Sequence, residues 1–173
     1  MPAASGNADI IRLDHGAALA VGNEHDAANA LHGAEYNLVV YTAREVPAPE
    51  QVLDDPRRRR KVRVFSLPLE DAARPLNLNE AMLVSQGVRI LATQLRLKKR
   101  ILVTSKNGIN RACYIAALIL AEAYGCGGEE AVRAVRRYRA RAKRALENPA
   151  FLQSVANVPR RPNGVYRLEL AAL

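Results

Sequence analysis

The chain has 173 residues, the length of one ordinary domain and enough to bury a hydrophobic core without disulfides or metals. Because 49% of its residues are hydrophobic and 25% are charged, wholly disordered and fibrous proteins are excluded. The formal net charge of +9 is typical of proteins with polyanionic or phosphorylated partners. Two cysteines, Cys113 and Cys126, are too few for a disulfide scaffold or a four-cysteine zinc site.

The low cysteine content predicts a cytoplasmic location or another reducing intracellular compartment. In the first seven residues no basic segment precedes an apolar run, so we expect no secretory signal. The longest apolar run is the nine residues Cys113–Ala121, whereas a membrane-spanning helix needs about 20. We therefore expect no membrane span.

In the first half of the chain, short strand patterns surround one helical pattern. We predict a hairpin of Ile10–Leu13 and Ala18–Val21, a helix over Glu24–Leu31, and strands over Tyr36–Thr42 and Lys61–Leu67.

The second half of the chain is mostly helical by pattern. We predict a long amphipathic helix over Leu78–Leu97, with Met82, Val84, Val88, Leu91 and Leu95 on its apolar face. A central strand over Arg100–Thr104 and a buried helix over Asn110–Tyr124 follow. A third helix opens at Gly127 and is basic over Arg133–Arg144, and a short helix runs from Asn148 to Val155.

This order of elements predicts an α/β fold, a three-layer sandwich with a central mixed sheet of about five strands and helices on both faces. Residues 1–158 are expected to form the domain. Residues 159–173, which contain Pro159, Pro162 and Gly164, are expected to be a loosely attached C-terminal tail.

The segment between the predicted strand ending at Thr104 and the buried helix has the features of a phosphate-binding loop. A short turn at this position directs backbone N–H groups inward, at the positive end of the helix dipole. Gly108 permits the unusual backbone angles that such a turn needs, and Arg111 can donate two parallel hydrogen bonds to phosphate oxygens. The predicted phosphate-binding residues are Lys106, Asn107, Gly108, Ile109, Asn110 and Arg111.

Several segments, in this order, resemble the cysteine-dependent protein phosphatases of the small dual-specificity type, which carry His-Cys-x5-Arg followed by Ser or Thr. These segments are Ala20-Val21-Gly22-Asn23 with Ala27-Ala28, Pro68-Leu69-Glu70-Asp71, Ser105 to Arg111, Gly128-Glu129-Glu130-Ala131 with Val135-Arg136, and Asn148-Pro149-Ala150-Phe151-Leu152. The resemblance covers nearly the whole chain and implies that residues 1–158 have the fold of this family. It also implies a phosphorylated protein as the ligand, with no metal and no cofactor.

The departures from the family pattern lie at its catalytic centre. Ser105 occupies the place of the nucleophilic cysteine, Thr104 that of the preceding histidine, and Ala112 that of the hydroxyl residue after the arginine. In the family a thiolate attacks phosphorus and forms a phosphocysteine. A serine hydroxyl is far more basic than a thiol, and the three histidines, at 15, 25 and 32, lie far upstream, so that route is closed. Loss of the thiolate also removes its repulsion of a phosphate dianion, so phosphate binding is expected to survive.

Two explanations for the serine stay open. The chain is either a natural pseudophosphatase that binds phosphorylated ligands or scaffolds an assembly, or an active phosphotyrosine, phosphoserine and phosphothreonine phosphatase captured as a Cys-to-Ser variant. Thr104 and Ala112 slightly favour natural divergence, because a designed trap changes the nucleophile alone. Some active relatives also carry alanine after the arginine, which keeps the second explanation open.

Asp71 is the predicted general acid, which protonates the leaving oxygen. It follows a predicted strand and precedes the long helix, where the family resemblance places this group, and Glu70 is the alternative carboxylate. A solvated turn aspartate is the simpler interpretation of the same residue.

The basic segments Arg57–Lys61 and Arg133–Arg144 suggest contact with RNA or a ribonucleoprotein, although both are also typical of solvated surfaces. The sequence Gly108-Ile109-Asn110-Arg111 resembles phosphatases that act on RNA 5′ ends, which gives a third hypothesis. With 5% aromatic residues and no tryptophan, the chain offers few platforms for base stacking.

Overall fold

The computed structural model describes residues 9–12, 16–33, 35–49, 62–139 and 145–164. Its five-stranded sheet has the order β1-β2-β5-β3-β4, with β1 antiparallel to β2 and the other neighbours parallel. The strands are β1 (Asp9–Arg12), β2 (Ala18–Gly22), β3 (Leu38–Ala43), β4 (Arg63–Leu69) and β5 (Arg100–Thr104). The expected mixed sheet is therefore confirmed.

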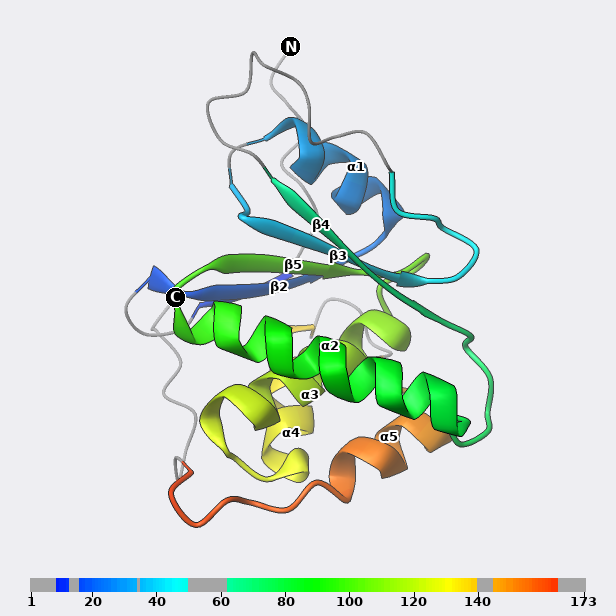
Figure 1. The fold of residues 1–173 in the computed structure, drawn as a ribbon, viewed down its shortest axis with the longest axis vertical. Coiled ribbons are helices and arrows are strands. Elements are labelled where there is room, and N and C mark those ends of the chain that lie inside the picture. The colour runs from blue at the N-terminus through cyan, green and yellow to red at the C-terminus, as the bar shows by residue number, and fades with distance from the viewer. Residues whose placement is uncertain (1–8, 13–15, 34, 50–61, 140–144, 165–173) are drawn as a thin grey trace.

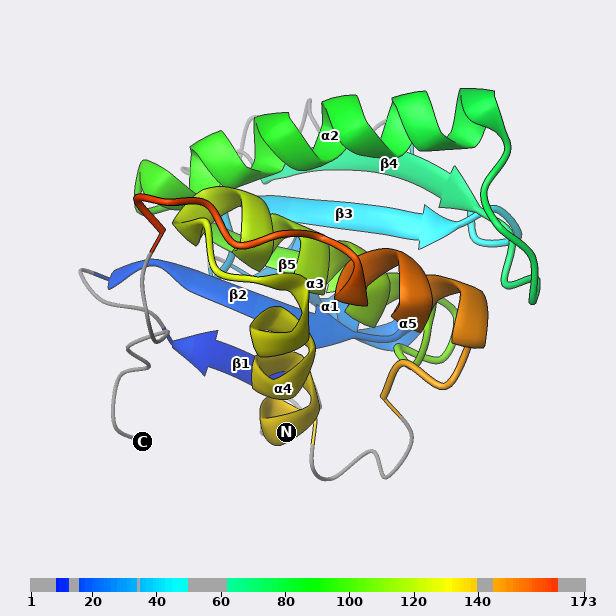
Figure 2. The ribbon, with the colours of Figure 1, turned by 90° about the horizontal axis from the view of Figure 1, so that it is seen from below.

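Helices cover both faces of this sheet, as expected (Figure 1). They are α1 (Glu24–His32), α2 (Leu78–Arg96), α3 (Arg111–Tyr124), α4 (Gly128–Tyr138) and α5 (Pro149–Ala156). Helix α1 lies alone on one face, and the other four gather on the opposite face, with α5 near the carboxyl ends of β3 and β4 (Figure 2). The three-layer α/β sandwich is thus the observed architecture.

The central strands are apolar because both faces of the sheet are covered. Every residue of β2 and β3 is buried, and so are Ile101 to Thr104 of β5. The larger core fills the space between the sheet and α2 to α5, and the smaller core lies under α1. Stacked rings of Tyr114 and Phe151, with centroids 4.5 Å apart, join α3 to α5.

Asparagine side chains cap the N-termini of three helices. Asn23 and Asn77 each form a capping box, with Asp26 and Glu80 respectively, and Asn148 caps α5 through its side-chain oxygen. The caps fix where α1, α2 and α5 begin, and Asn148 also contacts the candidate site described below.

The structure differs in part from the predicted elements. The basic helix ends at Tyr138, with Arg139 as its C-cap, and residues 140–144 lie outside the described part of the chain. The segment 57–61 also lies outside it. Met82 is predicted on the apolar face of α2 but is 52% exposed, because the buried side of this helix is centred on Val84, Val88 and Leu91. No helix among the described residues is long and apolar enough to cross a membrane.

Candidate functional site

The candidate site begins where the central strand β5 ends. Thr104 donates its hydroxyl to the carbonyl of Val40 at 2.9 Å, and its own carbonyl accepts from the hydroxyl of Thr42 at 2.8 Å. The N–H of Ser105 then donates to the carbonyl of Gly22 at 3.3 Å. These bonds hold Ser105 at the carboxyl ends of β2, β3 and β5, the edge where open α/β folds bind ligands. Thr104 therefore stabilises the sheet at this edge.

The 105–111 loop directs its carbonyl oxygens into the surrounding protein. The acceptors and their donors are the carbonyl of Lys106 with Glu24 N–H at 3.5 Å, Gly108 with Arg139 Nη2 at 2.7 Å, Ile109 with Leu146 N–H at 3.0 Å, and Asn110 with Tyr114 N–H at 2.8 Å. These four carbonyl oxygens are therefore all engaged in hydrogen bonds.

Most backbone N–H groups of this loop have no acceptor among the residues that the structure describes. Gly108 N–H donates to Ser105 Oγ at 3.1 Å. The remaining N–H groups of the loop have no partner in the described part of the chain; they belong to Lys106, Asn107, Ile109, Asn110 and Arg111. Unpaired N–H groups of successive residues before a helix N-terminus are suited to bind an anion.

Gly108 is the one residue of the loop with a positive φ, at +67°. A Cβ at this position would lie 2.7 Å from the carbonyl oxygen of Gly22. Glycine is therefore required here by both conformation and space.

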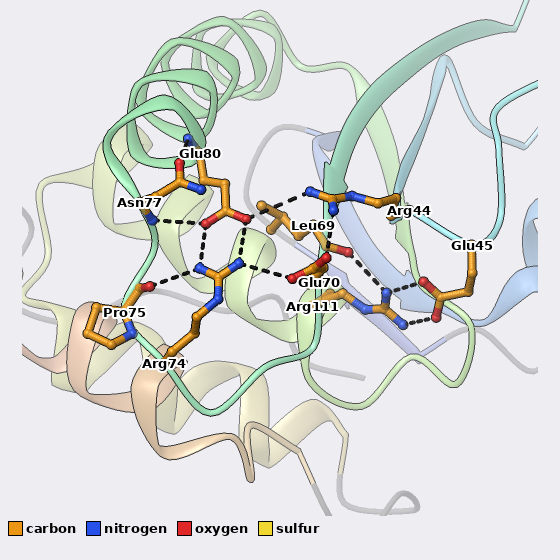
Figure 3. A network of polar contacts seen from close by, with 9 residues as sticks. All are labelled: Arg44, Glu45, Leu69, Glu70, Arg74, Pro75, Asn77, Glu80 and Arg111. Atoms are coloured by element: carbon orange, nitrogen blue, oxygen red, sulfur yellow. Dashed lines mark hydrogen bonds and ion pairs between the residues drawn. The ribbon is translucent and has the colours of Figure 1, made fainter.

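The guanidinium of Arg111 is buried and oriented by two partners, with its side chain only 7% exposed (Figure 3). Nη1 and Nη2 both contact the carboxylate of Glu45, and Nη1 also donates to the carbonyl of Leu69 at 3.1 Å. Nε is buried and has no partner among the described residues. The Nε–H and the second Nη2–H thus remain as a parallel pair on one edge of the guanidinium.

Glu45 is a residue that the sequence analysis missed. It follows β3 at the edge of the sheet where the 105–111 loop begins, and its hydrogen bond with Arg111 lowers its pKa from 4.5 to about 2. Glu45 is therefore an anion at every pH near neutral, and it compensates the buried charge of Arg111.

Asp71, the predicted general acid, lies beside the 105–111 loop. Its Oδ2 accepts from Asn110 Nδ2 at 3.0 Å, and its Oδ1 accepts from Asn148 Nδ2 at 2.9 Å. Asn110 in turn accepts the N–H groups of Glu147 and Asn148 through its own Oδ1. The two asparagines clamp the segment that carries Asp71 against the end of the loop, although Asp71 itself stays exposed.

Glu70, the alternative carboxylate, is used elsewhere. It contacts Arg44 at 2.6 Å and Arg74 at 3.0 Å, and Arg74 also binds Glu80 at 2.8 Å (Figure 3). Hydrogen bonds from Arg74 and from the backbone of Asn77 lower the pKa of Glu80 to about 2. This network anchors the segment after β4 to the start of α2.

Arg139 is the second residue that the sequence analysis missed. Its buried guanidinium donates from Nη2 to the carbonyl of Gly108 at 2.7 Å and from Nη1 to that of Val21 at 3.4 Å. Arg136 donates to the carbonyls of Ala145 and Leu146, each at 3.1 Å. Two arginines of the predicted RNA-binding segment Arg133–Arg144 therefore support the fold, and the structure gives no support to RNA contact.

The described residues contain no group of three or more His, Cys, Asp or Glu side chains that could hold a metal ion. Cys113 and Cys126 are buried free thiols, and burial raises the pKa of Cys126 to about 11. The Sγ of Cys113 donates to the carbonyl oxygen of Gly108 at 3.5 Å, and this side chain belongs to the larger core.

Comparison with solved structures places this fold among phosphatases. Human DUSP28 superimposes with a TM-score of 0.64 at 22% identity over 89% of this chain and 97% of that one. A mouse dual specificity phosphatase complexed with zinc tungstate gives 0.63 at 22% identity, over 90% and 92%. OH1 from the Orf virus, a tyrosine phosphatase, gives 0.58 at 21% identity, over 87% and 84%. No protein-family model and no curated protein matches the sequence. The chain therefore has the fold of the dual-specificity and tyrosine phosphatases.

Replacing Arg139 with methionine should lower the free energy of unfolding by about 2 kcal/mol, since a buried carbonyl loses a charged donor. The same change at the exposed Arg133 of α4 is the control and should cost less than about 0.5 kcal/mol. Urea unfolding of both variants measures the difference. Equal losses would contradict the assignment of Arg139 as the support of the loop.

The stability of the chain should fall as the pH drops from 4.5 towards 2, because the folded-state pKa values of Glu45 and Glu80 are lowered to about 2. Glu80→Gln should be less stable than the original chain at pH 7, and the difference should shrink through this acid window. Urea unfolding at several pH values tests this, with the exposed Glu129→Gln as control. A difference between Glu80→Gln and the original chain that does not change with pH would show that the Glu80 ion pair contributes nothing.

Proposed function

We propose that the chain binds the phosphate group of a phosphorylated protein in the 105–111 loop and, with serine at position 105, turns it over slowly or not at all. The observation that carries this proposal is the buried Nε of Arg111, which has no partner among the described residues. A buried donor without an acceptor is rare and costly in a folded protein. A phosphate oxygen would satisfy it.

The remaining donors match the shape of a phosphate. The free edge of Arg111 can give two parallel hydrogen bonds to two oxygens, and the unpartnered backbone N–H groups of the loop supply further donors. The mouse structure similar to this chain was solved with tungstate, a tetrahedral oxyanion like phosphate. This similarity supports an oxyanion ligand for the present chain.

Slow turnover follows from the surroundings of Ser105. In the described part of the chain, the hydrogen bond that its hydroxyl makes comes from the N–H of Gly108, so no base accepts its proton. A neutral alcohol attacks phosphorus poorly without such a base. We therefore favour a pseudophosphatase that recognises phosphorylated proteins, and a cytoplasmic location stays part of this proposal.

The second candidate is an active phosphatase that natively carries cysteine at position 105. One observation favours it: the carboxylate of Asp71 is still held beside the loop by Asn110 and Asn148. A binding module has no need of a positioned general acid, whereas hydrolysis does.

The chain should bind inorganic phosphate with one site per molecule, and Arg111→Lys should weaken binding about tenfold or more. Lysine keeps the charge but loses the parallel pair of donors. Isothermal titration calorimetry measures both, with Arg133→Gln as a control for net charge and circular dichroism as a check on folding. Equal affinity of the Arg111→Lys variant and the original chain would contradict binding in the loop.

The two candidates differ in the behaviour of Ser105→Cys. If the active-site geometry is intact, this variant should hydrolyse p-nitrophenyl phosphate, and adding Asp71→Asn should lower the rate about 100-fold. If the variant stays inactive while phosphate still binds, the chain is a binding module. A larger loss from Glu70→Gln than from Asp71→Asn would identify Glu70 as the acid.

A further inference from the structure

A cavity of about 760 Å³ lies between α2, α3 and α5, and no residue of the 105–111 loop lines it. Its volume is in the range of small-molecule sites, roughly 300 to 1,000 Å³. Most of the lining is apolar, including Val84, Val88, Tyr114, Leu118, Ala121 and Phe151. The cavity is therefore a second place where the chain can hold a ligand.

Among the charged side chains in the wall of the cavity, two have ion-pair partners and one does not. Arg74 is neutralised by Glu70 and Glu80, and Glu122 contacts Arg161. The guanidinium of Arg89, which also lines the cavity, has no partner among the described residues. One positive charge without a counter-ion thus stands beside a largely apolar space.

We propose that this cavity binds a small amphipathic anion. The apolar body would pack against Val88, Leu118 and the ring of Phe151, and its acidic head group would pair with Arg89. Apolar walls supply the affinity of such sites, and a single charged group fixes the orientation of the ligand. Charge complementarity with Arg89 selects an anion over a neutral molecule of the same shape.

The walls of the cavity also belong to the elements that hold the phosphate site. The segment from Ala73 to Leu76 begins two residues after Asp71, and it lines the cavity. Tyr114 lies one turn after Arg111 in α3, and Asn148, which clamps Asp71, is the N-cap of α5. A ligand in the cavity therefore contacts the segment after Asp71, helix α3 after Arg111, and helix α5 after Asn148, so occupancy should raise the affinity for phosphate. This coupling rests on the proposed function, whereas binding in the cavity does not.

Isothermal titration with decanoate, below its micelle concentration, tests the cavity. We expect saturable binding at one site, weakened about tenfold in Arg89→Gln and unchanged in Arg133→Gln, which removes the same charge from exposed α4. The neutral analogue 1-decanol should bind Arg89→Gln and the original chain equally. Ser85→Phe, at an exposed position in the wall, should block binding without burying a new group in the core.

Equal decanoate affinities of Arg89→Gln and Arg133→Gln, or undiminished binding by Ser85→Phe, would overturn the proposal. Sedimentation of the chain alone supplies a further outcome. A dimer that decanoate dissociates would show that a second copy fills the cavity, and the proposal would be wrong.

Repeating the titration with saturating phosphate tests the coupling, because any change in affinity must be reciprocal. Tighter decanoate binding with phosphate is the expected result. An unchanged affinity would overturn the coupling and leave the cavity site intact, while absence of phosphate binding would count against the proposed function instead.

Discussion

The structure depends on one constraint, a buried cation at the carboxyl edge of the sheet that is only partly compensated. Arg111 must be ionised, and burying its charge is costly unless it is paired and hydrogen-bonded. Glu45 and the carbonyl of Leu69 occupy one side of the guanidinium, and the other side keeps its donors. In the proposed function, an oxyanion completes this arrangement.

The other residues of the site hold the loop in the conformation in which these donors stay unpaired. Arg139 holds the carbonyl of Gly108 away from the loop interior, and contacts with α1 and residue 146 do the same for neighbouring carbonyls. Asn110 and Asn148 hold Asp71 in place, so the loop, the segment that carries Asp71 and α5 form one connected unit. The cavity between α2, α3 and α5 is lined by parts of this same unit. This is the physical basis for expecting a ligand in the cavity to change the affinity for phosphate.

The fold could be predicted because its local patterns agree with its topology. The strand Arg100–Thr104 is confirmed at both ends, and the apolar helix after it is confirmed to within one residue. Burial on both faces explains why continuous apolar runs identified the central strands. The place of Asp71 between β4 and α2 also followed from the sequence, while the roles of Ser105, Asp71 and Arg111 stay predictions.

The partners of the loop could not be predicted, because they are distant in sequence. Glu45 is 66 residues from Arg111, and only its position just after a strand at the same sheet edge could have suggested it. Arg139 stands in a run of arginines, and charge alone does not distinguish the buried one from its exposed neighbours. Tertiary contacts decide such cases.

The most direct test of the central claim is a nuclear magnetic resonance titration of the ¹⁵N-labelled chain with phosphate. The account predicts that the Nε–H signal of Arg111 and the backbone N–H signals of residues 106–111 shift together with one saturation curve. Phosphate-induced shifts confined to exposed basic residues, with the Arg111 Nε–H signal unmoved, would contradict it.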